Sequence, residues 1–90
     1  MKELDNIGVD NLSRAIIVQT ARDYLQLKTA IRNNPDDKNV ESWRSGLVAI
    51  KRFFNSEYYQ MLTKVSPDYL IRKLDEAFEE GKTTIEYITV

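Results

Sequence analysis

The stretch Lys51–Leu74, KRFFNSEYYQMLTKVSPDYLIRKL, decides the fold because it contains two helix starts in close succession. Ser56 precedes an acidic residue, and Ser66 precedes Pro67, which has no backbone N–H to leave unpaired at the first helical position. A serine before a helix accepts a hydrogen bond from a free backbone N–H of the first turn. We therefore predict a short helix over residues 57–64 and a longer helix over residues 66–80.

Two further helices are predicted upstream of this stretch, on either side of Pro35. Residues 12–32 contain no proline or glycine, and their apolar side chains recur on one broad face with helical spacing. A narrower apolar stripe runs from Val40 to Phe54. The residue before Pro35 is driven out of the helical conformation, so a loop separates the two patterns. We predict helices over residues 11–33 and 40–55, after a short polar lead over residues 1–9.

The predicted fold class is all-α. Residues 1–90 should form a single domain, a small bundle of three main helices and one short helix. The tail over residues 82–90, KTTIEYITV, is rich in β-branched residues, which have low helix propensity. We predict that this tail is non-helical, either as a strand or as a disordered segment.

One core should join the apolar stripes of these helices. Gly46 falls on the polar side of its predicted helix and should weaken it by up to about 1 kcal/mol relative to alanine. The predicted core consists of Tyr24, Trp43, Leu47, Ile50, Phe54, Leu62, Leu70, Leu74 and Phe78.

Composition argues against an enzyme. The 90 residues contain no cysteine and no histidine, which removes the usual zinc ligands and most nucleophile and general-base arrangements. The sequence also lacks a glycine-rich phosphate loop and a paired-carboxylate metal motif. The carboxylates between Asp75 and Glu80 are interpreted as a solvated helix face. We predict no catalytic residue, no metal site and no cofactor.

Charge and hydropathy argue against nucleic acid and membranes as partners. Thirteen basic and fourteen acidic residues give a net charge of −1, far from the strong positive charge of a non-specific nucleic-acid binder. No apolar run approaches the roughly 18 residues of a membrane span, and residues 1–11 lack the apolar core of a signal peptide. We predict a cytoplasmic protein that does not contact membranes.

The aromatic residues suggest where a partner binds. Tyr58 and Tyr59 are adjacent, so both phenols cannot be buried on one helix face, and one of them should be partly exposed. Exposed aromatic and basic side chains often dominate protein interfaces. The predicted contact patch consists of Trp43, Lys51, Arg52, Tyr58 and Tyr59. As a cluster, Phe53, Phe54, Tyr58 and Tyr59 are interpreted as core at a tight helix junction, and a stacking surface for single-stranded nucleic acid is the less favoured alternative.

DNA binding is the second functional reading. Residues 57–80 have the helix, short turn and helix of a helix-turn-helix unit. A recognition helix contacts bases mainly through its first residues, and here these are Pro67, Asp68 and Tyr69. Because Asp68 would repel phosphate, we favour a protein partner over nucleic acid.

Two segments, AIIVQTARDYLQL and FFNSEYYQMLTKVSPDYLIRKL, together hold 35 of the 90 residues and carry a family resemblance. They resemble short uncharacterised helical proteins of phages and integrated mobile elements of Gram-positive bacteria. The matching positions are Ala21, Asp23, Tyr24, Phe53, Phe54, Ser56, Glu57, Tyr58, Tyr59, Leu62, Thr63, Leu70, Ile71 and Leu74. The chain departs from that pattern at Tyr58-Tyr59, where a Trp-Phe type of pair is expected, and at Pro67-Asp68, where glycine is common. The resemblance implies an accessory protein and brings no activity with it.

The sequence therefore predicts a small non-enzymatic binding protein of a phage or mobile element, which contacts an unidentified host or phage protein. A DNA-binding regulator that uses residues 57–80 is the alternative. A homodimer is also expected, because the first helix is apolar over about half its circumference and the chain is small for a self-sufficient core. The tail has the composition of a strand but no partner strand within the chain, which also favours a homodimer in which two tails could pair.

Overall fold

The computed structural model describes the backbone of residues 2–81 and the side chains of residues 12–81. Over this range the chain forms four helices and no strand: α1 (Lys2–Asn33), α2 (Val40–Phe54), α3 (Glu57–Leu62) and α4 (Pro67–Glu79). The predicted all-α bundle is confirmed, and α2, α3 and α4 begin and end within two residues of their predicted bounds. The prediction for the tail concerns residues 82–90, which lie outside the described range.

The polar lead predicted at the N-terminus is wrong, because α1 begins at Lys2. The sequence there contains no proline, and a single glycine at Gly8 costs a helix only about 1 kcal/mol. Acidic residues at Glu3 and Asp5 suit the positive end of the helix dipole. Low apolar content was therefore mistaken for a break in the helix.

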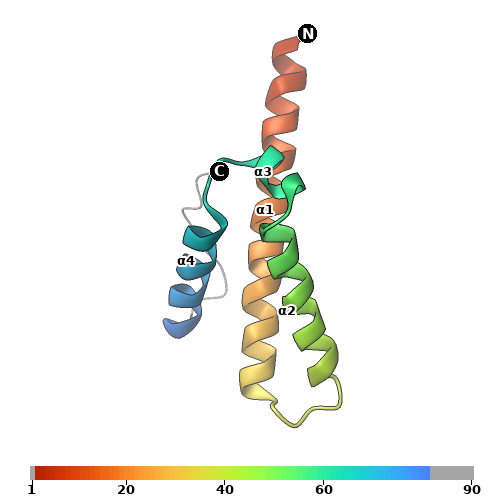
Figure 1. Cartoon of the computed structure of the whole chain (residues 1–90), viewed down its shortest axis with the longest axis vertical. Helices are drawn as coiled ribbons and strands as arrows, with labels where there is room; N and C mark the ends of the chain where they lie inside the picture. The colour runs from red at the N-terminus through yellow and green to blue at the C-terminus, as the bar shows by residue number, and fades with distance from the viewer. Residues whose placement is uncertain (1, 82–90) are drawn as a thin grey trace.

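Helix α1 is the spine of the molecule, and the other three helices pack against it (Figure 1). Helix α2 returns antiparallel to α1 after the loop at residues 34–39, and α4 lies on a different side of α1 (Figure 1). The short helix α3 contacts both α1 and α2. The result is an elongated body of 52 × 23 × 21 Å whose first turns of α1 extend beyond the other helices (Figure 1).

The helix ends follow the predicted signals. Ser56 accepts a hydrogen bond from the backbone N–H of Tyr59 at 3.2 Å, and Ser66 accepts one from that of Tyr69 at 3.4 Å. At the end of α4, Gly81 has a φ of 77°, which L-residues with a side chain rarely adopt. Its N–H donates to the carbonyl of Phe78 at 3.0 Å and closes the helix.

Most of the predicted core is confirmed. Tyr24, Phe54, Leu70, Leu74 and Phe78 are buried together, and Leu47, Ile50 and Leu62 pack against them. The buried cluster consists of Ile17, Ala21, Tyr24, Leu25, Phe54, Tyr59, Leu70, Leu74, Ala77 and Phe78.

Trp43 is the exception, because it is only half-buried and lies outside the core cluster. It occupies the second turn of α2, and α1 and α2 run past the end of α4 toward the connecting loop (Figure 1). Among the described helices, only these two reach that end of the molecule. The ring of Trp43 is therefore covered by helices on fewer sides than the ring of Phe54.

Gly46 was also misplaced by the sequence prediction. It faces α1, not solvent: a Cβ atom at this position would lie 2.9 Å from Cδ1 of Leu27. Real Cβ atoms almost never approach another carbon this closely, so the Leu27 side chain would have to move. The glycine allows α2 to lie close to α1, and this close approach offsets its low helix propensity.

Candidate functional site

The structure separates the two adjacent tyrosines of the predicted contact patch. Tyr58 is 52 % exposed, whereas Tyr59 is 0 % exposed and belongs to the core. The prediction that one phenol stays exposed is confirmed, but Tyr59 has to be removed from the patch. Its ring packs edge-on against Phe53 and Phe54 at centroid distances of 5.9 and 5.7 Å.

The other predicted patch residues do not gather around Tyr58. Trp43 lies ten residues before Phe53 on α2, which corresponds to about 15 Å along the helix axis. Lys51 is exposed, and its charge acts on Asp75 of α4. Arg52 is exposed and immediately precedes Phe53 in α2. Of the five predicted residues, Arg52 near the end of α2 and Tyr58 near the start of α3 lie closest to the α2–α3 junction as exposed side chains.

Two exposed apolar side chains of α3, with one partly buried ring beneath them, lie at this end of the molecule. Tyr58 and Met61 are 52 % and 82 % exposed and are three residues apart on α3, so they share one face of that helix. Phe53 lies beneath Tyr58 with a ring-centroid distance of 6.1 Å. We call Phe53, Tyr58 and Met61 the end patch.

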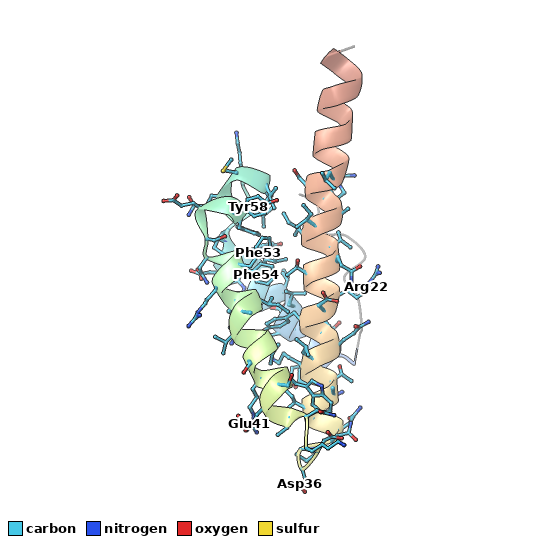
Figure 2. The ribbon with its side chains drawn as sticks, turned by 90° about the vertical axis from the view of Figure 1, so that its right-hand side faces the viewer. Arg22, Asp36, Glu41, Phe53, Phe54 and Tyr58 are labelled. Carbon is cyan, nitrogen blue, oxygen red and sulfur yellow. The ribbon has the colours of Figure 1, made fainter. Side chains whose placement is uncertain are left out.

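Helix α3 holds the end patch in a fixed position although it has only six residues. The capping serine Ser56 also donates its hydroxyl to the carbonyl of Phe53 at 2.6 Å. The phenol of Tyr59 donates to the carbonyl of Val65 at 3.0 Å, which ties α3 to the segment before α4. Burial raises the pKa of Tyr59, so this phenol remains a donor at neutral pH. Figure 2 shows Phe53, Phe54 and Tyr58 together where α2 meets α3, while Arg22 lies on the far side of α1.

A second constellation lies between α1 and α4. The hydroxyl of Tyr24 donates to Oδ1 of Asp75 at 2.6 Å, and Nζ of Lys28 donates to the same oxygen at 2.9 Å. Nζ of Lys28 also lies 4.7 Å from the ring centroid of Phe78, and the Arg32 guanidinium lies 4.4 Å from it. We call Tyr24, Lys28 and Asp75 the polar junction.

The pKa values of the polar junction favour a charged carboxylate and a neutral phenol. Burial, reinforced by the hydrogen bond to Asp75 and by its negative charge, raises the pKa of Tyr24. Burial alone would raise the pKa of Asp75, but the hydrogen bonds from Tyr24 and Lys28 and the charges of Lys28 and Lys51 lower it overall. At neutral pH the charged carboxylate of Asp75 therefore accepts a hydrogen bond from the neutral phenol of Tyr24, which links α4 to α1.

Sequence analysis missed this junction, because it assigned Asp75 to a solvated acidic face. One signal was present in the sequence: Tyr24 and Lys28 are four residues apart and so lie on one face of α1. Which carboxylate of α4 meets them depends on how α1 and α4 are rotated relative to each other, and the contacting residues are 51 and 47 positions apart in the chain. Helical periodicity within each segment does not determine that rotation.

Along α4 lies an open hollow of about 590 Å³, whose lining within the described residues includes five carboxylates. Within residues 12–81, no three acidic side chains are placed so that they could share a metal ion. In the same part of the chain, no helix is long and apolar enough to cross a membrane.

Comparisons with protein-family models, with curated proteins and with solved structures find no match to this chain.

Proposed function

We propose that this chain is a small non-enzymatic binding protein that acts by protein–protein contact through the end patch. In this proposal it is an accessory protein of a phage or integrated mobile element and works in the cytoplasm. Its partners are a protein of the host or the phage, or a second copy of the chain.

The observation that carries this proposal is the exposure of Tyr58 and Met61 on a short helix with a fixed position. Large apolar side chains exposed in this way cost solvation free energy unless a partner covers them. Tyrosine and methionine are also enriched at the centres of protein interfaces. The capping and phenol hydrogen bonds of α3 hold the patch in place, so binding would cost little conformational entropy.

The surface of α4 weighs against the DNA-binding alternative. Its exposed side chains include Asp68, Glu76 and Glu79, which would repel phosphate. The basic residue Lys73 already pairs with Glu76 at 3.4 Å, and its ammonium group lies 5.7 Å from the ring centroid of Tyr69. A helix with this charge pattern is a poor candidate for insertion into a DNA groove.

Affinity capture from a lysate of the source cells tests the proposal. The bait proteins are the wild type, Met61→Glu, and the control Val48→Glu, which alters a side chain that is 51 % exposed on α2. We expect at least one protein to be retained by the wild type and the control but to be reduced about tenfold on Met61→Glu, a loss of about 1.4 kcal/mol. Capture that is identical on all three baits, or that disappears after nuclease treatment, would contradict the proposal.

A further inference from the structure

The sulfur of this chain is confined to two methionines. The sequence contains no cysteine, so no thiol competes for an oxidant, and the methionines are Met1 and Met61. Met1 lies outside the described residues. Met61 is 82 % exposed, the most exposed of the large apolar side chains in residues 12–81. Because the oxidation of methionine follows its exposure, the thioether of Met61 is open to an oxidant in solution.

The position of Met61 on α3 separates it from the contacts that hold this helix. Tyr59 is fully buried, and its hydroxyl donates to the carbonyl of Val65 at 3.0 Å. At the other end of α3, Ser56 accepts a hydrogen bond from the backbone N–H of Tyr59. None of these contacts uses the side chain of Met61, and little of that side chain is covered. A polar group added to its sulfur should therefore leave α3 in place.

Oxidation would change the chemistry of the end patch. The thioether sulfur attacks one oxygen of hydrogen peroxide, the O–O bond breaks, and a sulfoxide and a water molecule form. The sulfur is oxidised and the peroxide is reduced. A flexible apolar side chain thereby becomes polar and chiral. Met61 shares one face of α3 with Tyr58, so the new S=O dipole would lie on the surface that is proposed to bind a partner.

We propose that Met61 is a redox switch of the end patch: peroxide converts its thioether to the sulfoxide, which prevents binding through the patch and leaves the chain folded. This inference rests on the proposed function and adds its regulation. The physical reason is desolvation, because a sulfoxide oxygen that loses water in an apolar interface costs free energy unless it meets a hydrogen-bond donor. The step is reversible, since a methionine sulfoxide reductase restores the thioether while two thiols become a disulfide and water is released.

Peroxide treatment of the full chain, followed by peptide mass spectrometry, tests the site. We expect one added oxygen at Met61, at a rate close to that of a short methionine peptide. The variant Met61→Leu should gain no oxygen in the same peptide. The oxidised wild type should keep the helical signal and the melting temperature of the untreated chain. A Met61 that resists peroxide, or an oxidised chain that unfolds, would overturn the inference.

Affinity capture separates the switch from the proposed function. The baits are the untreated wild type, the peroxide-treated wild type, and the treated wild type after repair by the reductases for both sulfoxide epimers with dithiothreitol. A protein whose capture depends on Met61 should be reduced about tenfold on the oxidised bait and should return on the repaired bait. Met61→Leu, compared only with its own untreated form, should not respond to peroxide.

The outcomes of this capture experiment distinguish the two proposals. If a protein that depends on Met61 is retained equally by the oxidised bait, the switch is excluded and the proposed function stands. A loss of capture on peroxide-treated Met61→Leu would also overturn the switch, because another residue would then carry the effect. If no bait retains a protein that depends on Met61, both proposals fail.

Discussion

At the scale of single residues, Asp75 is the side chain of α4 that forms polar contacts with α1. It accepts hydrogen bonds from Tyr24 and Lys28, which come from the same face of α1. Its side chain is 46 % exposed, so water screens part of each interaction. The junction should therefore fix the position of α4 on α1 more than it stabilises the fold.

A double-mutant cycle on Tyr24→Phe and Asp75→Asn measures this junction. Removing the hydroxyl deletes the 2.6 Å hydrogen bond without creating a large cavity, so Tyr24→Phe should cost about 1–2 kcal/mol in urea unfolding. The double variant should cost less than the sum of the single variants. Strict additivity of the two free-energy changes would show that the two groups do not interact in solution.

The same carboxylate predicts a dependence of stability on pH. The pKa of Asp75 is lowered in the folded state, so its contribution is complete above the ordinary aspartate value and is lost as the pH falls through the lowered value. The stability difference between wild type and Asp75→Asn should be constant from about pH 5 to 8 and should shrink below about pH 4. A difference that instead grows toward acid pH would reverse the assigned direction of the shift.

At the scale of helices, the sequence predicts local signals well and contacts between helices poorly. Ser56 and Ser66 act within one turn of themselves, and the structure uses both of them as predicted. Gly46 shows that contacts between helices are not predicted from the pattern of one helix. It falls on the polar side of the α2 pattern, but the packing of α2 on α1 places it against Leu27. The end patch was found only in part, since Tyr58 was named but Met61 carries no local signal that distinguishes it from a core residue.

Leu74→Ala tests the register of α4. Leu74 is fully buried in the core cluster, so this truncation should cost about 2–5 kcal/mol, through lost burial and a remaining cavity. Val48→Ala is the matched control, because that side chain is about half exposed and its truncation should cost less than about 0.5 kcal/mol. If Leu74→Ala melts within a degree or two of wild type, α4 packs through a different face.

At the scale of the whole molecule, the charge balance and the acidic surface of α4 predict weak binding to nucleic acid. The net charge is −1, and Asp68 occupies the first turn of α4. Gel-shift titrations at physiological salt should show no duplex complex below micromolar protein, as expected of a protein with this charge balance. A nanomolar site that survives competitor DNA would instead support the helix-turn-helix reading.

Site-specific photocrosslinking tests the central claim, contact through the end patch, most directly. A photoreactive amino acid placed at Met61 reports on the patch, and the same amino acid at Arg22, an exposed position on the far side of α1 (Figure 2), is the control. The account predicts a discrete protein adduct from position 61, whether to a second copy or to another protein, and none of comparable yield from position 22. Equal yields from both positions, or adducts to nucleic acid alone, would contradict it.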